Sequence, residues 1–359
     1  MTCAHPGAPE DACTRIQYPL GGKPLSESNG VFVKTNETRG DDFWLMAHEW
    51  RLPGCFASFA RRAPCQATIR RREANIMAEE PRLIDTLEAL RDAIGRYRRV
   101  DETVALVPTM GALHKGHLAL VQLAAREAHH VVVSIFVNPA QFAPSEDFAA
   151  YPRDMPADLA ALAGLKTDLV WAPNVALMYP AGFATQVVPT GAATVGLEDA
   201  FRPHFFAGVA TVVTKLLLQC LPDTAVFGEK DYQQLKVVEQ IVRDLDIPVR
   251  IVGGSTVRAA DGLALSSRNA YLSAEQRQVA PTLHRVLALC GKKLAPGYPV
   301  GTVLAEGREA IGRVGFELDY LEARHAETLL PVADPARESI RLLVAARLGP
   351  TRLIDNVGV

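Results

Sequence analysis

The alternation of apolar and polar positions predicts helices and short strands that follow one another along most of the chain. Between residues 81 and 100 apolar residues recur at helical spacing, which predicts an amphipathic helix. Short apolar runs follow, separated by stretches of helical pattern; they span 104–107, 131–137, 168–172, 225–227 and 249–252. Continuous apolar strands between helices are typical of parallel strands buried on both faces, so we expect a doubly wound α/β sheet of Rossmann-like type.

The first 76 residues have a different texture. They show no sustained period of 2 or 3.6 and contain scattered Pro and Gly. A signal peptide would need an apolar segment of roughly 7 to 15 residues, and a transit peptide would be poor in acidic residues. Because regular helical periodicity begins only after Met77, we expect residues 1–76 to be an extension that is disordered or not translated.

Composition narrows the class of protein. Hydrophobic residues make up 48% of the chain, and no apolar run approaches the ~20 residues of a membrane span, so we expect a soluble protein without a membrane partner. A formal net charge of -2 supplies no basic footprint for nucleic acid. None of the 6 cysteines forms a CxxC pair, which favours a reduced, cytoplasmic compartment over a zinc or redox site. Small molecules are the expected ligands.

The stretch "PTMGALHKGH" at 108–117 follows the first of these apolar runs and opens a predicted helix. Ligands of open α/β sheets bind beyond the carboxyl ends of the strands, which is where this stretch lies. His114 and His117 share one face of the first helical turn, where free backbone N–H groups and the helix dipole favour a phosphate. Gly116 would allow the phosphate to approach closely. The alternative is that the two histidines only cap the helix or are solvated; their spacing around a glycine favours the phosphate site.

These residues also carry a resemblance. "PTMGALHKGH" resembles the HIGH-type signature of the nucleotidyltransferase superfamily, and "VPTMGALHKGHLALV" is similar to the pantothenate synthetase (pantoate–β-alanine ligase) family. Four further stretches fit the same family in the right order: 131–154, 227–235, 256–273 and "LLVAARLGPTRLIDN" at 342–356. The resemblance covers the chain from about Met77 to Val359.

The resemblance implies an ATP- and Mg²⁺-dependent ligase. The carboxylate of pantoate would be adenylated with release of pyrophosphate, and the amine of β-alanine would then displace AMP to give pantothenate. It also implies a homodimer, with an ATP- and pantoate-binding Rossmann-like domain over residues 77–256 and a smaller α/β lid domain over residues 257–359. Residues 1–76 have no counterpart in the family.

The same resemblance assigns site residues. The ATP-binding residues that it implies are Met110, Gly111, Ala112, Leu113, His114, Lys115, Gly116 and His117, then Gly228, Glu229, Lys230 and Asp231, and finally Val257, Leu265, Ser266, Ser267 and Arg268. Catalytic roles fall on His117, His114, Lys230 and Arg268, and no residue is expected to ligate a metal. Lysine can neutralise phosphate charge, and the planar fork of arginine suits phosphate oxygens.

Two glutamines match the pantoate-binding positions of the family, Gln141 and Gln234. An amide offers two donors and one acceptor, which suits a substrate with hydroxyls and a carboxylate. The sequence departs from the family pattern at four positions. Ser255 stands where Pro is usual, Leu265 where Met is frequent, and His204 and Phe205 where Gly and His are frequent. We therefore assign no catalytic role to His204.

Two other functions remain open from the sequence. One is a nucleotidyltransferase that moves AMP or CMP onto a phosphate-bearing substrate, which would need further cationic residues near Gln141. The other is a non-catalytic nucleotide-binding protein. Such a protein would be expected to lack His117, Lys230 or Arg268, and all three are present.

Overall fold

The computed structural model describes residues 80–143 and 148–359. All of them belong to one unit of the chain, Pro64–Val359. The extension predicted over residues 1–76 lies outside the described residues.

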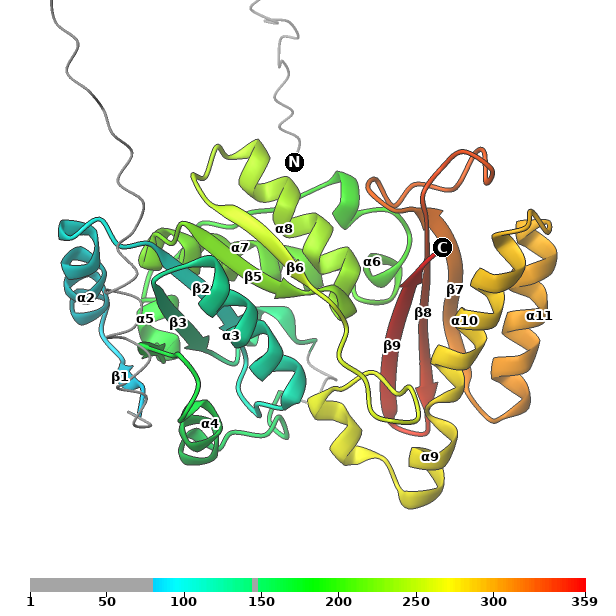
Figure 1. The fold of residues 1–359 in the computed structure, drawn as a ribbon, viewed down its shortest axis with the longest axis horizontal. Helices are drawn as coiled ribbons and strands as arrows, with labels where there is room; N and C mark the ends of the chain where they lie inside the picture. Colours follow the sequence, from blue (N-terminus) through cyan, green and yellow to red (C-terminus); the bar gives the residue numbers. More distant parts are fainter. Residues whose placement is uncertain (1–79, 144–147) are drawn as a thin grey trace, which may run out of the picture. The chain divides into compact units, whose positions relative to one another are not determined.

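A parallel sheet of six strands carries the candidate site (Figure 1). Its strands are β1 (Arg82–Ile84), β2 (Val104–Thr109), β3 (His130–Ile135), β4 (Leu169–Trp171), β5 (Thr224–Gly228) and β6 (Arg250–Gly254). Their order across the sheet is β1-β4-β3-β2-β5-β6. From β2 the chain winds outwards through β3 and β4 in one direction and through β5 and β6 in the other, and β1 pairs with β4 at the edge. The switch point between β2 and β5 is where open α/β sheets bind ligands. The predicted fold class is confirmed.

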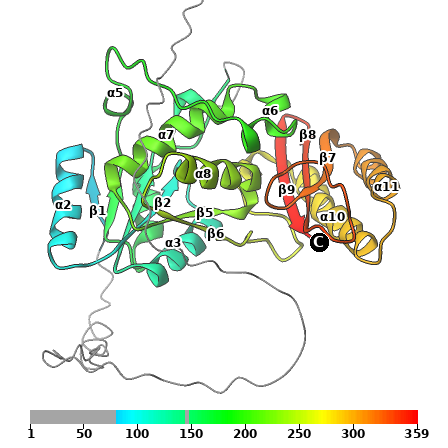
Figure 2. The ribbon, with the colours of Figure 1, turned by 90° about the horizontal axis from the view of Figure 1, so that it is seen from above.

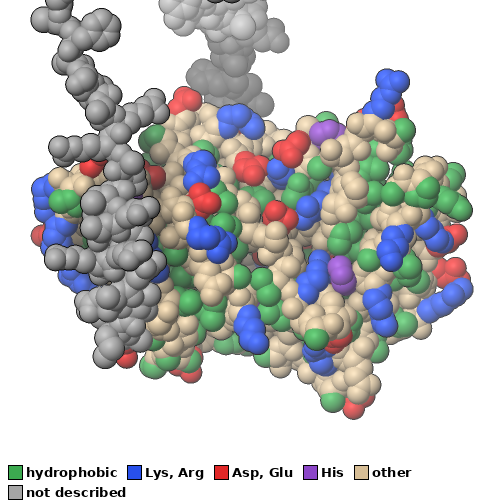
Figure 3. All heavy atoms as spheres, in the orientation of Figure 1, with side chains coloured by type: hydrophobic (Ala, Val, Ile, Leu, Met, Phe, Trp, Pro, Cys, Tyr) green, Lys and Arg blue, Asp and Glu red, His purple; other side chains and the backbone are tan. Residues whose placement is uncertain are grey.

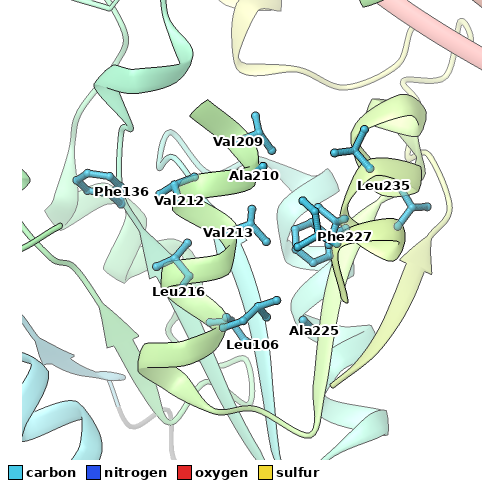
Figure 4. Close-up of a cluster of buried hydrophobic side chains, with 14 of the residues drawn as sticks. Leu106, Phe136, Val209, Ala210, Val212, Val213, Leu216, Ala225, Phe227 and Leu235 are labelled. Carbon is cyan, nitrogen blue, oxygen red and sulfur yellow. The ribbon is translucent and has the colours of Figure 1, made fainter. Parts of the chain in front are cut away.

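Helices cover both faces of this sheet, as the continuous apolar strands predict. They are α2 (Leu87–Arg99), α3 (Lys115–Glu127), α4 (Met155–Leu162), α7 (Phe205–Cys220) and α8 (Tyr232–Asp244). Alternate residues of β2 enter different cores: Leu106 packs with α7 and α8, whereas Val107 packs with α3. Figure 2 shows α7 and α8 on one side of the sheet and α3 on the other. Figure 4 shows apolar side chains of α7 gathered with Leu106 of β2 and Phe227 of β5.

The C-terminal part forms an antiparallel sheet of three strands in the order β7-β8-β9. Its strands are β7 (Glu317–His325), β8 (Ile340–Leu348) and β9 (Thr351–Gly358), and its helices are α9 (Ala274–Val279), α10 (Thr282–Leu294) and α11 (Val300–Arg313). Apolar side chains of α10, α11 and the strands pack into a separate core. Five short elements lie between strands and helices of the first part: η1 (Pro139–Gln141), α5 (Val175–Met178), η2 (Gly191–Ala193), α6 (Glu198–Phe201) and η3 (Glu229–Asp231). A sixth, η4 (Ser267–Tyr271), lies between β6 and α9. The domain boundary at 256/257 remains a prediction.

The helix predicted over residues 81–100 is wrong at its beginning. Residues 82–84 form β1, which pairs with β4, and α2 begins at Leu87. Thr86 ends the strand because its side chain accepts the N–H of Ala89 at 3.3 Å and caps the helix. Leu83 is 47% exposed and Ile84 is 3% exposed, and the pairing of residues 82–84 with β4 identifies the segment as a strand.

None of the helices in the described residues is long and apolar enough to cross a membrane. Basic and acidic side chains are interspersed over the face of the molecule shown in Figure 3.

Candidate active site

A cavity of about 850 Å³ lies at the carboxyl ends of β2 and β5. Predicted residues reach it from four separate stretches of the chain: Met110 and His117, Gln141, Lys230, Asp231 and Gln234, and Ser266 and Arg268. The other predicted residues belong to the same turns and loops without lining the cavity: Gly111, Ala112, Leu113, His114, Lys115, Gly116, Gly228, Glu229, Val257, Leu265 and Ser267. The strand order therefore brings together the stretches that the sequence analysis singled out.

His114 and His117 cap α3 as a pair. Nδ1 of His114 accepts the backbone N–H of Gly116 at 3.1 Å, and Nδ1 of His117 accepts the backbone N–H of His114 at 3.3 Å. The two rings stack with centroids 4.0 Å apart. A Cβ on Gly116 would lie 2.8 Å from Cε1 of the His114 ring, so the glycine is needed for the cap itself. The two histidines do cap the helix, as the alternative interpretation proposed. Each ring uses only Nδ1 for the cap, so Nε2 remains available for a phosphate.

Burial keeps both rings neutral. Burial is the main reason that the pKa of His117 is lowered to about 3, and the proximity of His114 and of the charged Lys230 contributes in the same direction. Burial also lowers the pKa of His114 to about 4, assisted by Lys230 and opposed by Asp231. Because each Nδ1 accepts a backbone N–H, the single proton of each neutral ring lies on Nε2. His117, which lines the cavity, thus offers it a fixed Nε2–H donor.

The turn before α3 is held by a residue that the sequence analysis missed, Asp158 of α4. Its Oδ1 accepts the N–H of Leu113 at 2.7 Å, and its Oδ2 accepts the N–H of Ala112 at 3.1 Å. Ala112 has a positive φ of 50°, a conformation that costs free energy for a residue with a Cβ. Asp158 is 3% exposed, and this burial raises the pKa of its carboxyl. We infer that the carboxylate maintains the turn that places Met110 and His117 at the cavity.

Gln141 is oriented by a buried neighbour. Nδ2 of Asn138 donates to Oε1 of Gln141 at 3.1 Å, so the Gln141 amide turns its Nε2 toward Sδ of Met110, 2.9 Å away at the cavity wall. Asn138 is itself 1% exposed, and its Oδ1 accepts the hydroxyl of Tyr179 at 2.7 Å. Asn138 belongs to the "NPAQF" stretch at 138–142, but its orienting role required the structure.

The neighbouring glutamines of α8 have different surroundings. Gln233 is 3% exposed; its Nε2 donates to the Ala192 carbonyl at 2.9 Å, and its Oε1 accepts the N–H of Glu198 at 2.9 Å. Gln233 is therefore engaged in joining α8 to η2 and α6. Both glutamines line the cavity, and Gln234 is the more exposed of the two, as predicted for a substrate-binding side chain.

Cationic side chains approach the cavity from two sides. Lys230 lies in the turn after β5, with Nζ 3.8 Å from Oδ1 of Asp231. Arg268 belongs to η4, whose first turn is capped by the Ser266 hydroxyl accepting the N–H of Arg268 at 3.3 Å. Ser267 lies close to the hydroxyl of Tyr151, at 3.2 Å. The arrangement provides positive charge and donors for an anionic ligand, next to amides for a neutral or carboxylate-bearing one.

The structure shows where two residues that depart from the family pattern lie, Phe205 and His204. Phe205 lines the cavity, and the guanidinium carbon of Arg202 lies 3.8 Å from the centre of its ring. His204 is exposed at the beginning of α7 and does not line this cavity.

Comparisons with known proteins show the family to which the chain belongs. Residues 82–358 match the model of the family described as pantoate-beta-alanine ligase. The chain is similar to the pantothenate synthetase of Bradyrhizobium sp. (58% identical over 283 residues, 79% of this chain and 100% of the relative). It is also similar to that of Nitrobacter hamburgensis (60%, with the same coverage).

Solved structures give the same result. A pantothenate synthetase structure from Thermus thermophilus is similar with a TM-score of 0.73 and 51% identity, covering 77% of this chain and 98% of that one. A pantoate-beta-alanine ligase from Francisella tularensis, complexed with beta-gamma ATP and beta-alanine, is similar with a TM-score of 0.66 and 32% identity, covering 77% and 97%. These similarities favour the ligase over the nucleotidyltransferase and the non-catalytic nucleotide-binding protein.

Proposed function

Because the chain belongs to the pantoate-beta-alanine ligase family, we propose that its cavity activates the carboxylate of pantoate as an acyl adenylate. The protein is a ligase that forms pantothenate from pantoate and β-alanine with ATP as co-substrate. The observation that carries the proposed route is the meeting of His117, Lys230 and Arg268 with Gln141 and Gln234 in one cavity.

The chemistry requires such a combination. A carboxylate is a poor electrophile because attack would add charge to an anion. When a carboxylate oxygen of pantoate attacks the α-phosphorus of ATP, pyrophosphate leaves and the acyl group gains AMP as a leaving group. The amine of β-alanine then attacks the acyl carbon, and AMP departs. Neither step needs a covalent bond to the protein, so catalysis rests on positioning and on stabilising phosphate charge.

We assign the phosphate side of the cavity to three groups. Lys230 and Arg268 supply positive charge from the turn after β5 and from η4. His117 supplies a neutral Nε2–H donor at the beginning of α3, where the helix dipole also favours negative charge. A neutral imidazole retains this role across physiological pH because its pKa is about 3. His114 acts on His117 through the shared cap.

The pantoate side is assigned to Gln141 and Gln234. Pantoate carries hydroxyls and a carboxylate around a dimethyl carbon. The amides can bind the polar groups, and apolar side chains at the cavity wall, such as Val213 and Phe227, suit the methyl groups.

Magnesium fits the site as a companion of ATP. Among residues 80–143 and 148–359 no three His, Cys, Asp or Glu side chains come together in a way that could hold a metal ion. Mg²⁺ commonly needs only one or two carboxylates besides substrate phosphates and water, and Asp231 is a carboxylate at the cavity. When bound, the ion would neutralise phosphate charge.

We also propose, from the family resemblance, that the protein is a cytoplasmic homodimer. Light scattering of the purified protein would measure its mass in solution, and a monomeric mass at working concentration would contradict the dimer.

The proposed route is tested by its products. The purified protein supplied with ATP, Mg²⁺, pantoate and β-alanine should form pantothenate, AMP and pyrophosphate in equal amounts, quantified by liquid chromatography and mass spectrometry. Lys230→Ala should reduce all three together. Formation of ADP and phosphate in place of AMP and pyrophosphate would overturn the adenylation route.

A further inference from the structure

The C-terminal stretch "TRLIDN" at 351–356 forms most of β9, and two of its neighbouring side chains reach two different parts of the site. Asp355 is 4% exposed and Asn356 is 3% exposed. Successive side chains of a strand point to opposite faces, so one strand can hold two elements at once.

Asn356 holds the turn that carries Lys230. Its Nδ2 donates to the backbone carbonyls of Glu229 at 2.9 Å and of Lys230 at 2.8 Å. Its Oδ1 accepts Nε–H of Arg341 at 2.7 Å. Both donors and the acceptor of this buried amide are thus engaged. Arg341 secures the same turn, because its Nη2 donates to Oε2 of Glu229 at 3.2 Å and its guanidinium carbon lies 3.9 Å from the centre of the Tyr232 ring.

Asp355 holds the hairpin that leads to Arg268. Its carboxylate accepts both ends of the Arg258 guanidinium, at 2.6 and 2.8 Å. Arg258 also donates to the Gly262 carbonyl at 3.1 Å across the hairpin, and its neighbour Val257 accepts the N–H of Leu265 at 3.0 Å. Leu265 is followed directly by Ser266, which caps η4. Through these contacts Asp355 stabilises the segments that carry Val257 and Arg268.

We propose that Asp355 and Asn356 are positioning residues that fix Lys230 and Arg268 relative to one another for binding the phosphates of ATP. The inference rests on the phosphate-binding role proposed for those two cations. The bidentate ion pair of Asp355 and the fully bonded buried amide of Asn356 hold both segments rigidly against β9. A displacement of either cation by about 1 Å is enough to impair a reaction that depends on positioning.

A double-mutant cycle tests this. Asn356→Ala should raise the KM for ATP and slow the pyrophosphate-forming half-reaction by about tenfold each, the scale of losing well-formed hydrogen bonds, while the KM for β-alanine is unchanged. If Asn356 acts through Lys230, the variant should have little further effect in a Lys230→Ala background. Leu348→Ala is the control: Leu348 lies on β8, 7% exposed, in the separate core, and its loss should lower stability without changing the KM for ATP.

The outcomes separate the two proposals. Additive effects of Asn356→Ala and Lys230→Ala, or a wild-type KM for ATP in Asn356→Ala, would overturn the positioning role. If Lys230→Ala itself left the half-reaction intact, the proposed role of Lys230 would fail instead. Should Asn356→Ala not fold, Arg341→Met removes the partner of the same amide and should give the same non-additivity with Lys230→Ala.

Discussion

His114 and His117 are tied to each other through the backbone at the beginning of α3: the N–H of His114 donates to Nδ1 of His117, and the rings stack 4.0 Å apart. The cap that stabilises the helix also directs the remaining N–H of His117. Capping and phosphate binding are therefore compatible functions of one pair of residues.

This arrangement makes stability depend on pH. The folded pKa values of about 4 for His114 and about 3 for His117 lie below the ordinary value of 6.5. Between these values the unfolded chain binds more protons than the folded one. The stabilisation is therefore complete above pH 6.5 and is lost as the pH falls toward 3, by at most about 1.4 kcal/mol per pH unit for each ring. We therefore expect the free energy of unfolding, measured by urea titration between about pH 4.5 and 7, to rise less steeply with pH in His117→Asn than in wild type.

His204→Asn is the control for this measurement, because it removes an exposed imidazole from the beginning of another helix. Equal slopes in the two variants would show that His117 does not titrate with the assigned pKa.

The neighbouring glutamines of α8 should respond differently to truncation. Gln234→Ala should raise the KM for pantoate by roughly 5- to 150-fold and leave the KM for ATP unchanged, because unpaired polar groups of the substrate cost about 1–3 kcal/mol. Gln141→Ala should behave likewise. Gln233→Ala should instead lower the midpoint of urea unfolding and raise the KM for pantoate less than Gln234→Ala does, because the Gln233 amide is bonded to Ala192 and Glu198 although it also lines the cavity. Steady-state kinetics with each substrate varied in turn will show this; equal weakening of pantoate and ATP would refute the assignment.

Asp158 should matter for the reaction without contacting substrate. Asp158→Asn leaves one of two partly buried backbone N–H groups without an acceptor, so the turn at Ala112 should lose its fixed conformation. We expect the first half-reaction to slow by roughly 10- to 100-fold, the scale for a misplaced catalytic group. Asp154→Asn at the cap of the same helix is the matched control, since Oδ1 of Asp154 accepts the N–H of Ala157 at 3.0 Å. An equal loss in both variants would indicate general damage to α4.

The first 76 residues should be dispensable for catalysis. Curated relatives are matched over their whole length by 283 residues of this chain, and 359 minus 76 leaves 283. A variant that begins at Met77 should therefore keep the kcat and KM values of the full chain. Loss of activity on this deletion, together with an intact mass showing that the native protein retains residues 1–76, would contradict the prediction.

The sequence predicts the parallel sheet and the cavity end of β2 well, because continuous apolar runs and a helix-opening motif are local signals. It misses β1, since a strand of three residues is defined by its partner β4 and not by its own pattern. The apolar spacing of Leu83 and Ile84 fits a helix as well as a strand, and pairing decides between them.

Contacts to backbone atoms are the part of the site that sequence could not supply. Asp158 and Asn356 bind peptide N–H and C=O groups, which nearly every residue carries, so no residue pattern marks their partners. The same applies to Gly116. A glycine is required there because a Cβ would lie too close to the ring of His114, and this contact is visible only in the structure. The choice of Gln234 over Gln233 came from resemblance, because periodicity places both on a helix and both line the cavity. Only the structure shows that the amide of Gln233 is bonded to Ala192 and Glu198.

An oxygen-transfer experiment tests the acyl adenylate most directly. With pantoate labelled by ¹⁸O in both carboxylate oxygens, attack on the α-phosphorus moves one labelled oxygen into AMP, and the other remains in the amide carbonyl of pantothenate. Before β-alanine is added, the protein should release about one equivalent of pyrophosphate per site, and His117→Ala should slow this release by ~10²-fold. Mass spectrometry should then find one ¹⁸O in each AMP; AMP without label, or pyrophosphate release that requires β-alanine, would contradict the account.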